Sequence, residues 1–153
     1  MLLLLFTLGN HRYGLEARQV IEVVPVAELK TIPRAPAYVA GLLNYRGTPI
    51  PVLDLTQMNQ SYPSRICMST RIILVSYRMD GATSRILGLM AERVTETAKK
   101  DPAEFVPTGV NTPDAPYLGS VANDEHGMLQ LMDIERLVPA EVRDLLFSPA
   151  TAA

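Results

Sequence analysis

The chain has 153 residues, 48% of them apolar, which is enough to fill one hydrophobic core or two small cores that share an interface. The charged side chains, 14 basic and 16 acidic, give a net charge of -2, so nothing in the composition attracts nucleic acid or an anionic lipid surface in general. The single cysteine excludes an internal disulfide, and we expect an intracellular protein in a reducing compartment.

The first segment, MLLLLFTL, is a short apolar run with no basic residue before it and no small-residue cleavage site. It is too short for a signal peptide or a membrane span, so we expect a buried first strand and no insertion into a membrane. Short apolar runs rich in Val, Ile, Leu and Tyr then recur between turn residues such as Gly9-Asn10 and Gly47-Thr48. The sequence therefore predicts an all-β fold with short helices.

The sequence also repeats itself. GLEARQVIE at 14–22 and GLMAERVTE at 88–96 share the pattern Gly-Leu-x-Ala-x-x-Val-x-Glu at an offset of 74 residues. Two later motifs, PAYVAGLLN with PYLGSVAN and PIPVLDL with GMLQLMDI, repeat at an offset of 79. The order of motifs is the same in both halves, which indicates two copies of one small β unit of roughly 70 residues.

A unit of this size with about five short strands can close as a small barrel, which removes exposed sheet edges. We therefore predict two small barrels, with repeat cores at roughly 14–55 and 72–134, packed over a shared apolar seam. A cleft between two such units is where a binding surface is expected.

Two aspartates follow apolar strands and precede short helical patterns. We interpret Asp54 and Asp133 as helix N-caps rather than as acid–base groups, with Gln57 at the capping-box position. This interpretation leaves both carboxylates in a structural role.

The C-terminal segment 133–147 has the apolar spacing of an amphipathic helix, interrupted by Pro139. We expect this helix to close the base of a barrel, and its apolar stripe could alternatively bind a partner. The tail SPATAA, residues 148–153, is predicted to be disordered, which leaves a single domain over residues 1–147.

The residues that an enzyme or a cofactor site would need do not occur in telling patterns. His11 and His126 lie in predicted solvent-exposed turns. Neither histidine has a serine or Cys67 at a sequence spacing that suggests an activated nucleophile. No pair has metal-ligand spacing, and the glycines are isolated rather than grouped as in a phosphate-binding loop. We therefore expect no catalytic residue, no metal, no cofactor and no nucleic-acid site, which favours a binding module.

Together these motifs resemble the CheW-like domain family of bacterial chemosensory systems, from Leu3 to about Phe147. The most specific stretch is IPRAPAYVAGLLNYRGTPIPVLDL, and FTLGNHRYGLEARQVIEVVP, RIILVSY, GLMAERVTE, YLGSVAN and LQLMDIERLV add to it. The resemblance implies two SH3-like five-stranded barrels around a shared hydrophobic core.

The resemblance also implies a function. CheW-like proteins are non-enzymatic adaptors that couple the cytoplasmic tips of methyl-accepting chemoreceptors to the regulatory domain of the histidine kinase CheA. This kinase domain has the same fold, so adaptor and kinase can pack barrel to barrel and build rings, and other CheW-like domains are further expected partners. The expected location is the cytoplasm, with recruitment to membrane-associated receptor arrays, and the lack of a receiver-domain Asp cluster after the barrels predicts a stand-alone adaptor.

Five partner-binding residues follow from the resemblance by motif position. Arg46 is the arginine of the family's Arg-Gly turn, and Gly47 lets the backbone reverse there. Val20 and Glu22 fall on the receptor-binding side of the first barrel, and Val94, the equivalent valine of the second copy, is expected to form the other wall of the groove. We expect the Arg46 head to lie free to bond a carboxylate or carbonyl, with Glu22 fixing its direction. In a purely structural alternative, Arg46 pairs with Glu22 only to hold the turn.

The sequence departs from the family pattern at Met90-Ala91-Glu92-Arg93, and the Pro-rich segment 101–116 diverges most. Two other functions stay open at this point. One is a small-molecule-binding β-barrel with a pocket lined by Tyr13, Tyr38 and Tyr45. The other is a scaffold that packs against other CheW-like modules without a kinase.

Overall fold

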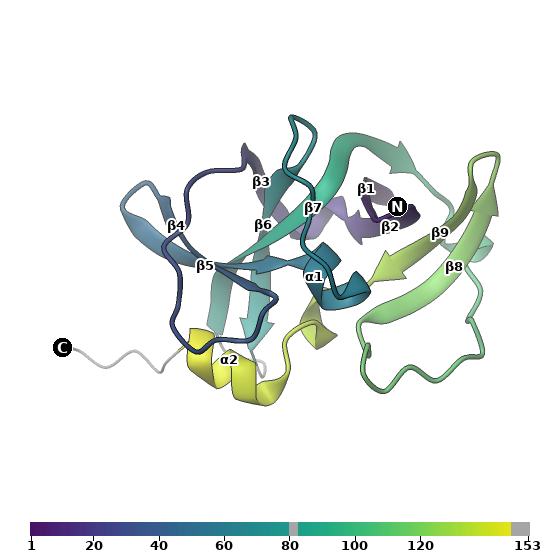
Figure 1. Ribbon diagram of the computed structural model, residues 1–153. Helices are drawn as coiled ribbons and strands as arrows, with labels where there is room; N and C mark the ends of the chain where they lie inside the picture. The colour runs from purple at the N-terminus through teal and green to yellow at the C-terminus, as the bar shows by residue number, and fades with distance from the viewer. Residues whose placement is uncertain (80–82, 148–153) are drawn as a thin grey trace.

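The computed structural model describes residues 1–79 and 83–147 (Figure 1). Apolar runs form the strands, and the glycine-containing and polar segments between them reverse the chain. The described strands are β1 (Leu2–Leu8), β2 (His11–Glu16), β3 (Val20–Pro25), β4 (Val39–Tyr45), β5 (Thr48–Asp54), β6 (Arg71–Met79), β7 (Thr83–Lys99), β8 (Leu118–Asp124) and β9 (Gly127–Met132). The described helices are η1 (Ala17–Gln19), α1 (Leu55–Gln60), η2 (Pro102–Glu104), η3 (Ile134–Arg136) and α2 (Ala140–Leu146).

The strands form two groups of five, which Figure 1 shows as two lobes joined by β7. One group contains β1, β2, β8, β9 and the end of β7, and the other contains β3, β4, β5, β6 and the beginning of β7. Continuous ladders do not close either group. An isolated β-bridge lies at the open side of each group, between Lys30 and Leu42 in one and between Val106 and Val121 in the other. The predicted all-β fold with two five-stranded, barrel-like units is confirmed.

Each unit takes two of its five strands from the other half of the chain. After β2, the short helix η1 carries the chain across to β3, which pairs with β6. In the second half β7 continues without a break from its pairing with β6 to its pairing with β1. It bends at Arg93, which has a φ of +49°, where the register with β1 shifts between Leu5 and Thr7. The stretches 14–22 and 88–96 that repeat in the sequence are the two crossings between the units.

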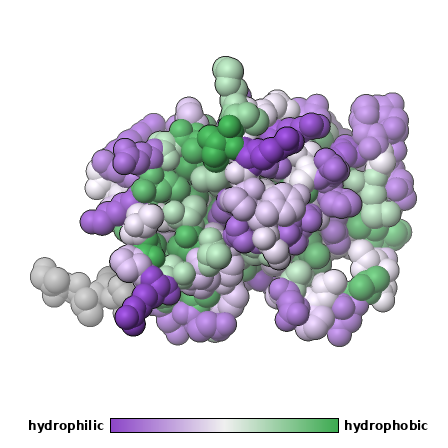
Figure 2. Space-filling view, viewed as in Figure 1, coloured by the Kyte–Doolittle hydropathy of each residue, from purple (hydrophilic) through white to green (hydrophobic). Residues whose placement is uncertain are grey.

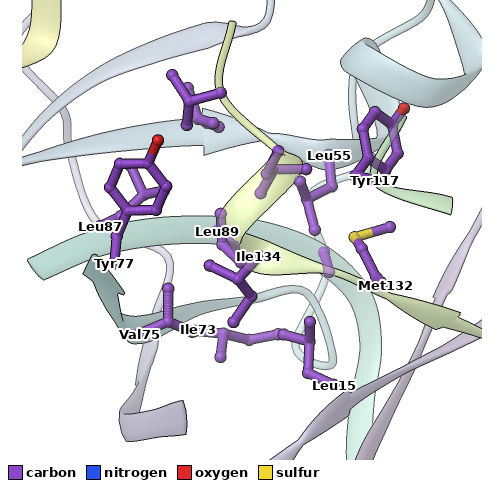
Figure 3. Close-up of a cluster of buried hydrophobic side chains, with 14 of the residues drawn as sticks. Leu15, Leu55, Ile73, Val75, Tyr77, Leu87, Leu89, Tyr117, Met132 and Ile134 are labelled. Carbon is purple, nitrogen blue, oxygen red and sulfur yellow. The ribbon is translucent and has the colours of Figure 1, made fainter. Parts of the chain in front are cut away.

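The largest apolar cluster lies between the two units and is built from both halves of the chain. It contains β1, β2, β5, β6 and β7 side chains together with residues of the C-terminal helices, and Figure 3 shows Leu15, Tyr77, Leu89, Tyr117 and Ile134 converging there. A smaller cluster fills each unit, around Ile72 in one and around Leu3 in the other. The predicted shared seam is therefore the main core of the protein.

Asp54 caps α1, as predicted. Its Oδ1 accepts hydrogen bonds from the backbone N–H groups of Thr56 and Gln57, at 3.1 and 3.3 Å. Gln57 contributes this N–H rather than a capping-box side-chain bond. Instead, Ser64 donates its backbone N–H to Oδ2 at 3.0 Å and its hydroxyl to Oδ1 at 2.6 Å, which fastens the loop after α1.

The C-terminal segment forms two short helices rather than one, because Pro139 ends the first turn and stands at the N-cap of α2. Asp133 caps η3 by accepting from the Glu135 N–H at 3.0 Å, as predicted. Phe147 stacks on Tyr77 with ring centroids 5.7 Å apart, so this segment covers one side of the shared core. The tail predicted to be disordered lies outside the described residues, and the domain limits of 1–147 stay a prediction.

Candidate partner-binding surface

The β4–β5 hairpin turns at Arg46 and Gly47, because Tyr45 already pairs with Thr48. Both turn residues have positive φ, +52° for Arg46 and +86° for Gly47, as in a type I′ turn. The Asn44 side chain holds the turn by accepting from the Gly47 N–H at 2.9 Å. Glycine suits its position, whereas an arginine in the left-handed region costs roughly 1–2 kcal/mol. This position is therefore expected to have a use beyond turn formation.

Arg46 is exposed but not free to swing. Its Nη2 lies 3.5 Å from Oε1 of Glu22 on β3, and its guanidinium lies 5.0 Å from the ring centroid of Tyr45. The side chains of Arg46 and Glu22 are 77% and 39% exposed. The predicted pairing of Arg46 with Glu22 is present, and it holds an exposed guanidinium beside β3 and the Tyr45 ring.

Tyr45 is the third member of this group. Its hydroxyl donates to the same Oε1 of Glu22. This hydrogen bond requires the protonated phenol, so it is the main reason that the pKa of Tyr45 is raised. The contact joins β4 to β3, the two strands at the open side of this barrel. The sequence suggested Tyr45 only as a lining residue of a small-molecule pocket. It gave no sign of the contact with Glu22, because the two residues are 23 positions apart and no local spacing links them.

The two valines of the predicted groove lie in different surroundings. Val20 stands opposite Val75 at the start of β3, is partly buried and packs against the shared core. Val94 is only 1% exposed and belongs to that core, while its backbone N–H donates to the Ser69 carbonyl at 2.9 Å. The structure therefore brings Arg46, Gly47 and Glu22 together, but it leaves Val94 no side-chain surface for a partner.

An apolar groove lies at the end of β3. It has a volume of about 680 Å³, and its exposed rim is formed by Met68 and Ile66, which are 96% and 66% exposed. Figure 2 shows apolar side chains gathered in the upper left part of the viewed face. The only sequence signal for this groove is the apolar pair Ile66 and Met68 in the otherwise polar loop between α1 and β6, and a pair of this kind does not by itself predict a groove. The lining residues are Val23, Val24, Pro25, Val26, Ile66, Cys67, Met68, Thr70 and Arg71.

The three tyrosines of the small-molecule alternative do not line one pocket. Tyr13 is buried, and its hydroxyl accepts from Asn59 at 2.9 Å. Tyr38 lines a separate pocket of about 560 Å³ with Tyr117, and Tyr45 bonds Glu22. The pocket expected for this alternative is therefore not formed, and the alternative loses its support.

The groups that could bind a metal or act as a nucleophile lie apart from this surface or on its rim. Within residues 1–79 and 83–147, no group of three or more His, Cys, Asp or Glu residues is placed to hold a metal ion. His11 and His126 are exposed, as predicted. Hydrogen bonds to the hydroxyls of Thr70 and Ser69 lower the pKa of the exposed Cys67 to about 7. None of the helices described is long and apolar enough to cross a membrane.

Comparison with known proteins decides the family. The model of the CheW-like domain matches residues 2–142 of this chain. The chain belongs to the CheW-like domain family. The predicted resemblance is thereby confirmed, and with it the assignment to a family of non-catalytic chemotaxis adaptors.

Named relatives agree with this CheW-like assignment. The chain is 27% identical over 144 residues to the chemotaxis protein CheW of Klebsiella aerogenes, covering 90% of this chain and 81% of the relative. It is 30% identical over 122 residues to the protein FrzA of Myxococcus xanthus, covering 79% of this chain and 68% of the relative. It also resembles the crystal structure of the scaffolding protein TtCheW from Thermoanaerobacter tengcongensis, with a TM-score of 0.76 and 28% identity over 87% of this chain and 84% of that one.

Proposed function

We propose that this CheW-like adaptor couples the cytoplasmic tip of a chemoreceptor to the regulatory domain of a CheA-type kinase, and that the Arg46 turn lies at one of these interfaces. The protein contributes no catalysis in this role. It acts in the cytoplasm, is recruited to receptor arrays, and packs there against other CheW-like domains as well. Residues 1–147 act as one unit, which the core shared by both halves supports.

The observation that carries the proposal is the state of Arg46. The residue keeps an unfavourable positive φ, stays 77% exposed and is aimed by Glu22 and Tyr45. An arginine that only held the turn would have no need of this exposure, and asparagine or glycine would form the turn with less strain. A pre-oriented guanidinium loses little side-chain entropy when it binds, which suits an interface.

Val20 and Glu22 extend the proposed surface along β3, with Gly47 at its tip. Val94 supports the surface from the core and does not touch the partner. The apolar groove at the end of β3 adjoins Glu22 in the sequence and offers further contact area beside the charged pair.

Calorimetric titration of the full chain tests the proposal, against the CheA regulatory domain and against a receptor's cytoplasmic hairpin from the same cell. We expect micromolar or tighter binding, and we expect Arg46→Glu to weaken one of the two complexes by about 1–3 kcal/mol. Arg136→Glu is a matched control, because Arg136 is similarly exposed, at 71%, and pairs instead with Asp133, the N-cap of η3.

Unchanged binding by a folded Arg46→Glu protein to both partners would remove Arg46 from the interfaces. Binding to the receptor hairpin without binding to any kinase domain would favour the kinase-free scaffold.

A further inference from the structure

The carboxylate of Glu22 uses its two oxygens unequally. Oε1 accepts the Tyr45 hydroxyl and lies 3.5 Å from Arg46 Nη2. Among the described residues, no donor reaches Oε2. The remaining N–H groups of the Arg46 guanidinium likewise meet no acceptor in the part of the chain that the structure describes. The surface therefore presents a free donor and a free acceptor next to each other, on side chains that are 77% and 39% exposed.

We propose that this pair binds the side-chain amide of an asparagine or glutamine on the adaptor's partner. The amide carbonyl would accept from the Arg46 guanidinium, and the amide NH₂ group would donate to Oε2 of Glu22. An amide carries one acceptor, its oxygen, and one donor group, its NH₂, on the same carbon, which matches this arrangement. The inference rests on the proposed function, since it takes Arg46 to lie at a partner interface.

A carboxylate is the weaker match, although arginine alone would favour it. A partner carboxylate at Arg46 would lie beside Glu22, and two like charges at that distance repel. Glu22 also offsets much of the guanidinium charge. A backbone peptide group matches less well than a side chain, because most backbone donors and acceptors of a folded partner are already paired with each other.

Tyr45 is the positioning residue of this site. Its hydroxyl bonds Oε1, which leaves Oε2 as the available acceptor, and its ring lies 5.0 Å below the guanidinium. Both groups are thus fixed before the partner arrives. The adaptor pays less ordering entropy on binding than it would with two free side chains.

The test is the sign of the change in affinity for Glu22→Gln, measured by titration of the full chain with the kinase regulatory domain and with the receptor hairpin separately. An amide partner predicts that binding weakens by about three- to tenfold, because an uncharged acceptor replaces the carboxylate. A carboxylate partner predicts that binding tightens, because a like charge is removed. Tyr45→Phe keeps the ring and loses the hydroxyl, and we expect it to weaken binding by about threefold.

A second measurement changes the partner. Each exposed asparagine and glutamine of the partner is converted singly to the corresponding acid and titrated with the wild-type chain and with Glu22→Gln. We expect one conversion to abolish binding to the wild-type chain and to be rescued by Glu22→Gln, whose amide can donate to the new carboxylate. Tighter binding by Glu22→Gln, or no rescued conversion, overturns the inference.

Arg46→Glu, measured in the same series, distinguishes failure of the proposed interface from failure of the amide inference alone. Melting curves confirm that each variant is folded. If Arg46→Glu binds both partners as the wild-type chain does, the proposed interface is wrong and the amide inference falls with it. If Arg46→Glu weakens binding while Glu22→Gln tightens it, the proposed function stands and only the amide inference is overturned.

Discussion

Replacing Arg46 by asparagine separates the contribution of this residue to the turn from its contribution to binding. The backbone of residue 46 has a φ of +52°, a conformation that asparagine adopts more readily than arginine. The replacement keeps the turn but removes the guanidinium that Glu22 and Tyr45 orient. If Arg46 serves a partner, the variant should stay stable and bind poorly.

The expected change in stability is small because two effects oppose each other. Relief of the left-handed conformation favours the variant by about 1 kcal/mol or more. Loss of the ion pair removes up to about 1 kcal/mol, since the guanidinium is 77% exposed. Loss of the contact with the Tyr45 ring removes about 0.5–1 kcal/mol at an exposed site. We therefore expect the free energy of unfolding of Arg46→Asn to change by less than about 1 kcal/mol.

Urea unfolding followed by circular dichroism measures this change, and titration with the kinase and receptor domains measures binding. Arg34→Asn is the matched control, because Arg34 is also exposed and also has a positive φ, +63°, but lies between β3 and β4 rather than on the proposed surface. Asparagine adopts this conformation more readily than arginine, so this variant should be at least as stable as the wild-type chain and keep its binding. A loss of more than about 2 kcal/mol in Arg46→Asn, with binding intact, would refute the reasoning and support the purely structural role of Arg46.

Three further outcomes follow from the structure. Leu53→Ala removes a fully buried side chain of the shared core, so urea unfolding should show a free energy of unfolding lower by about 2–5 kcal/mol. Leu145→Ala, at a half-exposed position, is the control and should change it by less than about 0.5 kcal/mol. Asp124 is bonded by Arg12 and Lys100, which hold its pKa below the usual range. The stability it contributes is therefore complete above about pH 4 and lost as the pH falls further, and pH-dependent melting of Asp124→Asn should show a smaller loss over that range than the wild-type chain does. In an ultraviolet pH titration, Glu22→Gln should lower the pKa of Tyr45 toward its ordinary value, and an unchanged titration would contradict the Tyr45–Glu22 hydrogen bond.

The internal repeat predicted the two units and their shared core, because identical spacings in both halves imply identical strand orders. It did not predict how the units share strands. GLEARQVIE breaks at η1 into β2 and β3, whereas GLMAERVTE runs through β7 with a bend at Arg93. Nothing in the two stretches differs strongly enough to predict this, since the bend depends on pairing with β1, about 90 positions earlier in the chain.

The site was predictable where a local motif carries it. The Arg46-Gly47 turn follows from the local motif. The pairing of Arg46 with Glu22 followed only from the family resemblance, and the placement of Val94 does not follow from similarity to Val20. The alternation of buried and exposed residues along β7 does agree with the burial of Val94: Glu92 and Val94 are buried, and Arg93 and Thr95 are exposed. Residues brought together only by closure of the barrel, such as Tyr45 with Glu22, leave no signal in a single sequence.

The exchange of strands between the halves bears on how the chain acquires its structure during synthesis. The unit that contains β3 and β6 has all its strands only once the beginning of β7, near residue 90, has left the ribosome. The other unit begins with β1, which pairs antiparallel with β2 on one side and with the end of β7 on the other, and this group is complete only at Met132. The first strand to emerge thus belongs to the last unit to close. Until then the nascent chain carries a leucine-rich edge that no part of its own half can fully cover.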